Sequence, residues 1–485
     1  MARFAAALRG LAVTFAVALG LLALGVGFAL QDLPAALRPA PSPPKVILLD
    51  NVSVLSMVPG APMLEGDRAL RIEEGRITAI VPAGSLAPEP GALIVDGARG
   101  FLMPGLIDAH VHLNDESELA AYLAQGVTGI RNMSGYPFHL DLPNRLESRT
   151  LRGPDFITTG RILNSAGPNA NVLQHLVETA EEARAAVAAQ ADAGFTRIKV
   201  YSNLAPEAFD AVVDEAHRRG LPLTGHSPEG RRGPGVPYDM PFEIPLTASL
   251  KQSFTTLEHV ESVVWHGLRD RLDPVAMGAL AQTLAEAEQP ITPTLIAHRR
   301  LLRIAESGGA YLERPGSEMI NPFLRFIEAG AEGYWSAADP APYERPHAEF
   351  FLTATGMLHR AGVPLLVGTD AGGFGLIPGR SVVEELALLV KAGLTPFEAL
   401  EAATRVNAEV LGFPGAGQIA PGEKANLLLL ASNPLEDFAA FEAPMAVAVR
   451  GEWLDAEALQ ALRDAAADTS FLRSAWRALE MLPSP

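Results

Sequence analysis

Cysteine is absent from all 485 residues of this sequence. Its absence excludes disulfide bonds, thiol nucleophiles and cysteine-held zinc fingers, and it leaves the redox compartment open. Positive charge is also scarce: 38 Lys and Arg residues stand against 56 Asp and Glu residues, a formal net charge of −18. Nucleic-acid binding needs a basic face against the phosphates, so we expect no nucleic-acid partner. Any bound metal must be held by histidine, carboxylate or modified side chains.

A long apolar run lies near the N-terminus. Leu11–Leu30 contains no charged residue and follows Arg3 and Arg9. As a helix rising about 1.5 Å per residue, it would span roughly 30 Å, the thickness of a bilayer's hydrocarbon core. The positive flank should stay in the cytoplasm. We therefore predict that residues 1–30 are a cleaved signal peptide or a retained membrane anchor. The rest of the chain would be exported, either periplasmic or anchored in the inner membrane and facing the periplasm.

Composition changes along the chain indicate several further segments. Residues 31–44 contain five prolines and read as an extended linker. Residues 45–100 show short β-rich runs separated by turns, and a similar pattern returns over residues 414–455, so the two pieces predict one small β-sandwich domain. Residues 456–485 form a helical tail. Its Leu472, Trp476 and Leu479 share helical spacing, and we expect them to pack against the body, with a membrane or partner surface as the alternative.

Strands and helices alternate between these pieces, from residue 101 to residue 413. Alternation favours an α/β fold, a parallel (β/α)8 TIM barrel with its active site at the C-terminal ends of the strands. Helical patterns cover Glu181–Ala193, Pro206–Arg219, Phe350–Ala361 and Arg380–Leu411. The eight expected strands are Gly105–Leu113, Val127–Asn132, Phe156–Thr159, Thr196–Tyr201, Pro222–His226, Thr255–Val260, Ile291–Thr294 and Pro364–Thr369.

Candidate metal ligands lie at the C-terminal ends of these strands. His110 and His112 are two residues apart on the first strand, so their side chains share a face and form half of a metal site. The remaining candidates are Lys199 on the fourth strand, His226 at the end of the fifth, His259 on the sixth and Asp370 after the eighth.

Several of these segments resemble the amidohydrolase superfamily. The first-strand signature is Met103-Pro104-Gly105-Leu106-Ile107-Asp108-Ala109-His110-Val111-His112, and Leu394–Leu411 followed by Gly417–Gly422 matches the C-terminal return. Ile198–Tyr201 and Glu258-His259 are similar to the imidazolonepropionase-like and Xaa-Pro dipeptidase-like branch. The resemblance covers about Val46 to Leu454.

The resemblance implies a centre of two divalent metal ions, with zinc as the default. One metal would be held by His110, His112 and Asp370, and the other by His226 and His259. A lysine ammonium has no acceptor, so Lys199 would bridge the two metals as a carbamate formed with CO2. The alternative for this residue is an ordinary lysine paired with a carboxylate.

The same resemblance assigns chemistry to Asp370 and Tyr201. A metal-bridging hydroxide would attack the substrate, and Asp370 would act as general base and then acid, or else as a ligand only. Tyr201 lies two residues past Lys199 and would stabilise the oxyanion or hold a substrate carboxylate, or else pack in the barrel. Arg131 and Asn132 would meet an anionic substrate or form a structural salt bridge.

Other polar residues near the expected barrel mouth leave more than one interpretation. Asn164, Asn169 and Asn171 lie in a loop where dipeptidase relatives often carry a histidine. Residues 229–253 are rich in Gly and Pro and predict a substrate lid or a plain surface loop. No histidine follows in this loop until His175. His266, His298 and His347 are expected at the surface or behind the ligands, with a place in the pocket lining as the alternative, and His139, His217 and His359 at the surface without a role.

The predicted activity is hydrolysis of an amide C–N bond in a small molecule, such as a dipeptide or an N-acyl amino acid. Three alternatives stay open. They are a lactonase or phosphotriesterase on the same binuclear site, a mononuclear imidazolonepropionase or deaminase, and a non-catalytic binding protein anchored in the envelope. The sequence does not identify the substrate. A homo-oligomer is left open as well.

Overall fold

A computed structural model describes residues 27, 33–232, 242–252, 254–373 and 375–480. The predicted signal or anchor segment lies outside the described residues, apart from Gly27, as do residues 233–241 of the predicted lid. Within the described ranges, no helix is both long and apolar enough to span a membrane.

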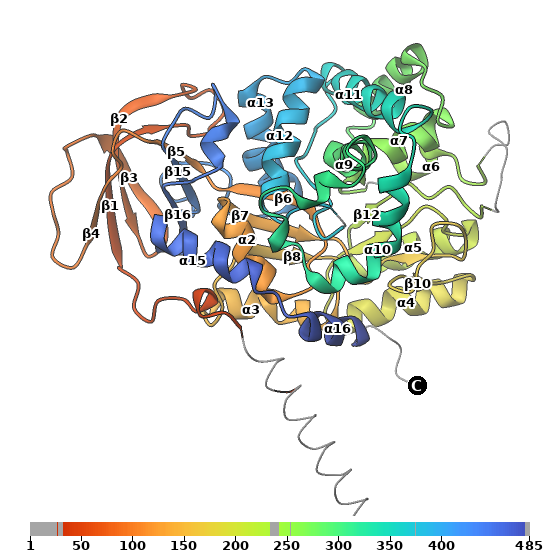
Figure 1. Cartoon of the computed structure of the whole chain (residues 1–485), viewed down its shortest axis with the longest axis horizontal. Coiled ribbons are helices and arrows are strands. Elements are labelled where there is room, and N and C mark those ends of the chain that lie inside the picture. The colour runs from red at the N-terminus through yellow and green to blue at the C-terminus, as the bar shows by residue number, and fades with distance from the viewer. Residues whose placement is uncertain (1–26, 28–32, 233–241, 253, 374, 481–485) are drawn as a thin grey trace, which may run out of the picture.

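A mixed sheet at one end of the molecule joins the two β-rich parts of the chain (Figure 1). Its strands run in the order β17-β16-β15-β5-β1-β2-β3, and β4 pairs with β1. The C-terminal part enters the sheet where β15 pairs antiparallel with β5. All eight strands are hydrogen-bonded into one sheet, so the expected sandwich is not confirmed. The strands are β1 (Val46–Val54), β2 (Glu65–Glu73), β3 (Arg76–Pro82), β4 (Leu93–Asp96), β5 (Phe101–Pro104), β15 (Leu427–Leu430), β16 (Ala446–Val449) and β17 (Glu452–Asp455).

The middle of the chain forms two parallel sheets that together make a TIM-barrel-like α/β fold. One sheet has the order β6-β7-β8, and the other has the order β10-β9-β11-β12-β13-β14. Every residue of β6 and β7 is buried, as expected for parallel strands covered on both faces. The strands are β6 (Leu106–Val111), β7 (Val127–Asn132), β8 (Asp155–Thr158), β9 (Leu163–Asn164), β10 (His175–Leu176), β11 (Ile198–Val200), β12 (Leu223–Gly225), β13 (Leu257–Glu258) and β14 (Ile291–Thr292).

The extended segment 365–369 stands in place of the expected eighth strand and connects the two sheets. Leu365 forms a parallel bridge with Ile291 of β14, and Val367 accepts a 2.9 Å hydrogen bond from the amide of Ala109 in β6. On the opposite side, the amide of Gly160 donates to the carbonyl of Arg197 at 2.9 Å. Hydrogen bonds therefore join the two sheets on both sides, although they do not form one continuous sheet.

Helices cover the outside of these parallel strands (Figure 1). The predicted boundaries of Pro206–Arg219 match α5, because Pro206 occupies its first turn and Gly220 ends it with φ 68°. The helices are α2 (Leu119–Ala124), α3 (Leu142–Glu147), α4 (Ala180–Ala193), α5 (Pro206–Arg219), α6 (Leu246–Leu250), α7 (Val260–Leu268), α8 (Pro274–Glu286), α9 (Leu295–Glu306), α10 (Pro322–Ala337), α11 (Glu344–Arg360), α12 (Arg380–Ala392), α13 (Pro396–Glu401) and α14 (Asn407–Leu411), with short turns η2 (Glu116–Glu118), η3 (Pro137–Leu140), η4 (Ala310–Glu313), η5 (Ser317–Met319), η6 (Ala402–Val406) and η7 (Phe438–Phe441).

Part of the predicted linker is attached to the body. Its turn η1 (Ala35–Leu37) buries Leu37, and the Arg152 guanidinium donates to the carbonyl of Ala36. The chain then leads into β1, so residues 33–37 are not a free spacer.

The helical tail forms α15 (Ala456–Ala467) and α16 (Phe471–Leu479). The expected packing of its apolar stripe is wrong: Leu472, Trp476 and Leu479 are 59%, 42% and 57% exposed. The opposite side of α16 faces the body instead, because Arg473 forms an ion pair with the buried Asp115. A buried ion pair, rather than apolar burial, sets the orientation of this helix.

Candidate metal centre

Parallel strands bring the six predicted ligands to one end of the barrel-like sheets. His110 lies on β6 with His112 just after it, and Lys199 lies on β11. His226 and His259 each follow directly after a strand, β12 and β13, and Asp370 follows segment 365–369.

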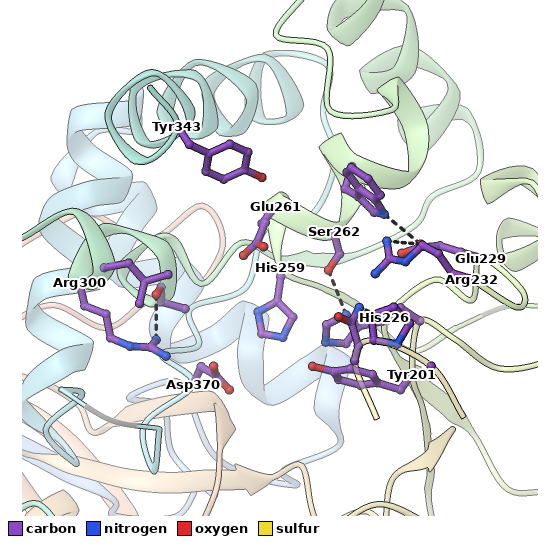
Figure 2. A pocket seen from close by; sticks show the side chains of 17 residues that line it. Tyr201, His226, Glu229, Arg232, His259, Glu261, Ser262, Arg300, Tyr343 and Asp370 are labelled. Carbon is purple, nitrogen blue, oxygen red and sulfur yellow. Dashed lines mark hydrogen bonds and ion pairs between the residues drawn. The ribbon is translucent and has the colours of Figure 1, made fainter. Parts of the chain in front are cut away.

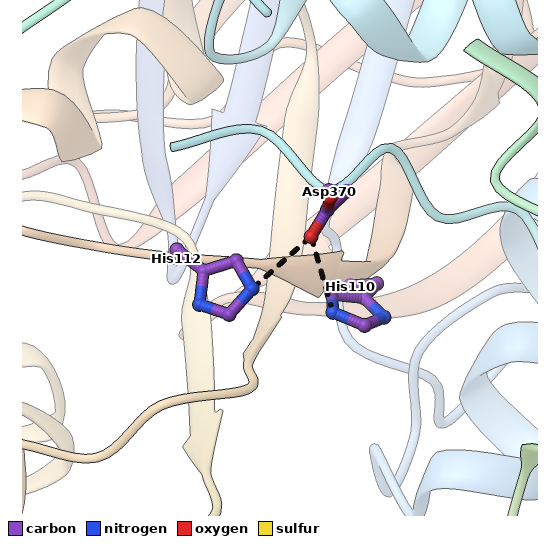
Figure 3. Close-up of side chains that lie close together, drawn as sticks. All are labelled: His110, His112 and Asp370. Carbon is purple, nitrogen blue, oxygen red and sulfur yellow. Dashed lines mark ion pairs between the residues drawn. The ribbon is translucent and has the colours of Figure 1, made fainter. Parts of the chain in front are cut away.

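Three of these residues converge on one point (Figure 3). Asp370 Oδ1 lies 3.1 Å from His112 Nε2 and 3.4 Å from His110 Nε2. One ligand atom from each of the three residues lies within 4.8 Å of the others, a spacing that a single metal ion could bridge. The structure therefore brings together the residues predicted for the first metal.

The other predicted ligands adjoin this group. Lys199 Nζ lies 3.2 Å from His110 Nε2. The ring of His259 is 4.8 Å from that of His110 and 4.6 Å from that of His226, measured between centroids. The six predicted residues thus form one continuous cluster.

Hydrogen bonds from behind orient three of the imidazoles. His110 Nδ1 lies 2.7 Å from Glu258 Oε2, His226 Nδ1 lies 3.0 Å from Ser262 Oγ, and His259 Nδ1 lies 2.6 Å from Thr294 Oγ1. In each ring, the partner occupies Nδ1 and leaves Nε2 for the centre. This arrangement is typical of metal-binding histidines, whose outer nitrogen is held by a second residue.

Burial keeps these imidazoles neutral, the form that can ligate a metal. It lowers the pKa of His110 and His226 well below the usual value and that of His259 to about 4. Burial also lowers the pKa of Lys199 to about 8. For Asp370, the hydrogen bond from His112 and the nearby imidazoles outweigh burial and hold the carboxyl pKa well below its usual range. The donor set fits a divalent first-row metal.

Glu258, named from the sequence only as part of the family motif, supports the site from beneath. Its side chain is fully buried, and one carboxylate oxygen contacts His110 while the other accepts from Arg131 Nη2 at 2.7 Å. Arg131 also donates to the carbonyl of Ala109 and is 1% exposed. Of the two interpretations of Arg131, the structure therefore supports the structural salt bridge. The sequence contains a signal for this pair. A carboxylate on a buried strand needs a cationic partner, and Arg131 on the buried strand β7 is one.

Three of the fourteen described non-glycine residues with positive φ lie in the same region. His259, Thr294 and Asp370 have φ values of 63°, 45° and 61°. Non-glycine residues adopt such angles at a cost of roughly 1–3 kcal/mol, and they concentrate at functional sites. Two predicted ligands and the partner of one of them are thus held in unfavourable conformations by the surrounding structure.

A cavity of about 910 Å³ opens onto the cluster (Figure 2). Tyr201, His226, His259 and Asp370 lie at its floor, and the Tyr201 ring lies against that of His226 with centroids 3.9 Å apart. Burial raises the Tyr201 pKa, so its hydroxyl stays protonated. The remaining lining residues include Asn169, Glu229, Arg232, Glu261, Ser262, Trp265, Arg300 and Tyr343.

Other predicted polar residues lie in different places. Asn132 is buried and holds the loop after β6 through the amide of Leu113. Asn164 is buried and bonded to Gln174, whereas Asn171 lines a smaller hollow of about 250 Å³ that also reaches His112 and Lys199. The predicted lid contributes Glu229 and Arg232 to the cavity, and its central part lies outside the described residues.

Four histidines expected at the surface or behind the ligands are buried and bonded within the body. His139, predicted at the surface, contacts the carbonyl of Leu113, and its ring lies between those of Phe138 and Phe156. His266, His298 and His347 are also buried, and none of them lines the cavity.

Comparison with known proteins agrees with this architecture. Residues 292–454 match the amidohydrolase family. The chain is 24% identical to ochratoxinase from Aspergillus niger over 415 residues, covering 71% of this chain and 73% of that protein. It is 27% identical to imidazolonepropionase from Ralstonia nicotianae over 391 residues, covering 75% and 86%. The solved structure of bottromycin amidohydrolase superposes with a TM-score of 0.68 at 26% identity, covering 90% of this chain and 94% of that one. Residues 292–454 therefore form an amidohydrolase-family domain, and the chain is a hydrolytic enzyme.

Proposed function

We propose that this enzyme hydrolyses an amide C–N bond of a small molecule, with a dipeptide or an N-acyl amino acid as the substrate class. The observation that carries the proposal is the cluster of four histidines, Lys199 and Asp370, which faces the large cavity and the smaller hollow beside it. A relative named bottromycin amidohydrolase supports amide chemistry on this fold.

The cluster divides naturally into two metal positions. We assign His110, His112 and Asp370 to one metal and His226 and His259 to the other, with zinc as the default ion. Lys199 lies between the two groups, and its pKa of about 8 makes the neutral amine accessible. Only a neutral amine adds CO2, so this environment favours the carbamate that would bridge the metals. The bound ions would supply Lewis acidity and lower the pKa of a coordinated water.

Asp370 and Tyr201 are placed for the proton transfers and for charge stabilisation. The Asp370 carboxylate reaches the cavity floor, where it would accept a proton from the attacking water and deliver it to the leaving amine. The Tyr201 hydroxyl keeps its proton and would donate a hydrogen bond to the oxyanion. Both roles require the substrate carbonyl to lie over the His226–His259 side of the cluster.

The cavity wall favours an amide with an anionic group and an apolar part. Arg300 supplies positive charge, whereas Arg232 pairs with Glu229 at 2.9 Å, and Trp265 and Tyr343 supply aromatic surface. An N-acyl amino acid presents both features, a carboxylate and an acyl group. At about 910 Å³, the cavity falls near the upper end of the usual range of ligand pockets, so it has room for more than a minimal dipeptide.

We also propose that the enzyme is exported and stays attached to the inner membrane through residues 11–30, facing the periplasm. The support is the uncharged run itself with Arg3 and Arg9 before it.

Metal analysis followed by a hydrolysis screen tests the proposed activity. Protein purified with zinc and bicarbonate should contain two metals per chain, and Lys199→Ala should lose at least one. The matched control is His217→Ala, an exposed histidine of α5 away from the cavity. The screen compares dipeptides, N-acyl amino acids, lactones and phosphotriesters. Turnover of lactones or phosphotriesters alone would contradict the amide assignment.

A further inference from the structure

The outer side of α16 and the neighbouring part of α10 form an apolar surface that the rest of the described chain leaves uncovered. On α16, Leu472, Trp476 and Leu479 follow each other at spacings of four and three residues, so they share one side of the helix. We call the following set the α10–α16 surface: Phe326, Ile327, Phe471, Leu472, Trp476 and Leu479, all of them exposed.

Ring contacts make this surface continuous across the two helices. Phe471 of α16 contacts Phe323 and Phe326 of α10, each with centroids 5.6 Å apart. Fourteen large apolar side chains are exposed among the described residues, and seven of them lie on α10 and α16. Exposed apolar residues scattered singly are ordinary, but this concentration marks an interaction surface.

The polar side of α16 is fixed to the body, so the helix cannot turn to bury its apolar side. Arg473 Nε lies 2.5 Å from Asp115 Oδ2, and both side chains are buried. Arg477 Nη2 lies 2.8 Å from Glu116 Oε1, and Asn321 at the start of α10 donates to Ser474 Oγ at 2.8 Å. Rotation would leave buried charges without partners, which costs several kcal/mol.

The chain enters the body next to α16, and this position indicates what the α10–α16 surface faces. Leu33, Ser470 and Arg473 line one hollow, so the first residues of the body lie beside the start of α16. Figure 1 shows η1 and α16 along the same edge of the molecule. Only Gln31 and Asp32 separate Leu33 from the uncharged run at residues 11–30. Two extended residues reach at most about 10 Å, so an anchored run would hold this edge close to the bilayer.

We propose that the α10–α16 surface rests on the membrane that holds residues 11–30. This inference rests on the retained anchor proposed above. Tryptophan, phenylalanine and leucine on one side of a helix are the side chains that enter the headgroup boundary of a bilayer. A second copy of the chain would satisfy the apolar side chains equally well. The short tether favours the bilayer, because it places this edge, and no other, next to lipid.

Because the chain has no cysteine, a single introduced cysteine gives one unique label. We would attach a spin label to Leu472→Cys and, as the matched control, to Val275→Cys. Val275 is 83% exposed on α8, on the opposite side of the molecule from α16 (Figure 1). The full chain is reconstituted into phosphatidylcholine vesicles, attachment is checked by flotation, and collisions with oxygen and with a water-soluble nickel complex are measured. We expect the label at 472 to collide about fivefold less often with nickel than the label at 275, and more often with oxygen.

Each other outcome would overturn the inference in a recognisable way. Equal nickel access at the two positions on floating vesicles would leave the anchor and remove the docking surface. A chain that does not float would remove both. Protection from nickel and oxygen alike, with spin–spin broadening that grows with protein density, would assign the surface to a second copy. Amide hydrolysis by the same samples is read separately, so failure of the proposed activity cannot be mistaken for any of these results.

Discussion

Two regions depart from the usual distribution of polar and apolar residues in opposite directions. One is the mouth, the end of the barrel-like sheets where the six predicted ligands lie, and the other is the α10–α16 surface. At the mouth, His110, Lys199 and Glu258 are polar or charged and buried. On the surface, Leu472 and Phe326 are apolar and exposed. Each departure lowers the free energy of unfolding. An interaction with another molecule at the same place would offset that loss. The two regions therefore carry the two proposals, chemistry at one and membrane attachment at the other.

The largest effect should come from Asp370→Asn, which removes a proton acceptor from the mouth and keeps its shape. We expect kcat/KM for the amide substrate to fall about 10³-fold, because a positioned general base contributes on the order of 10²–10⁴-fold. Steady-state kinetics measures this, with His217→Ala as the control that keeps wild-type activity. A loss under about tenfold would limit Asp370 to a ligand role.

Glu258→Gln should lower both the stability of the chain and the metal affinity of the mouth. The change leaves Arg131 buried without its anionic partner and removes the acceptor that orients His110. We expect the free energy of unfolding to fall by about 3 kcal/mol and metal affinity to fall about 10- to 100-fold. Urea denaturation and metal titration measure the two effects.

The matched control for this change is Arg184→Ala, which breaks the exposed pair with Asp214 on the outer helices. An exposed pair contributes under about 1 kcal/mol, so this variant should unfold almost as the wild type does. Equal losses from the buried and the exposed pair would show that Glu258 does not organise the site.

Burial of His298 should make stability depend on pH. Its pKa is lowered to about 4, mainly by burial, from an ordinary value of 6.5. The unfolded chain therefore binds a proton below pH 6.5 that the folded chain does not take up until about pH 4. Stability from this group is complete above pH 6.5 and is lost as the pH falls toward 4. Relative to His298→Asn, the wild type should lose at most about 1.4 kcal/mol per pH unit in this window. A stability difference that is constant from pH 7 to pH 5 would contradict the prediction.

Local sequence signals predicted the barrel strands and the clustering of the six candidate side chains at their ends, and metal binding by these residues stays a prediction. Val127–Asn132 matches β7, because Gly126 before it and Ser134-Gly135 after it are turn residues that limit the choice of boundary. The expected strand Pro364–Thr369 is the least regular of the eight in the structure. Segment 365–369 pairs only through single bridges, and the backbone turns into a left-handed conformation at Asp370. The family resemblance, rather than periodicity, supplied the role of Lys199.

Features that depend on contacts between residues far apart in the sequence were not predicted. Helical spacing shows that Leu472 and Trp476 share a side of α16, but it does not show which side meets the body. That choice depends on Asp115, 358 residues before its partner Arg473. Burial of His139 between aromatic rings likewise depends on β8, a separate strand. Periodicity describes one element at a time, whereas these outcomes depend on pairs of elements.

The smallest effect should come from the surface itself. Leu472→Ser changes an exposed side chain, so the free energy of unfolding should change by less than about 0.5 kcal/mol. Leu459→Ala on α15 removes a fully buried leucine from the same tail and should cost about 2–5 kcal/mol. Urea denaturation of both variants separates the two roles of the tail. If Leu472→Ser destabilised the chain as much as Leu459→Ala, the apolar side chains of α16 would serve to stabilise the fold. The contrast between the mouth and the α10–α16 surface would then disappear.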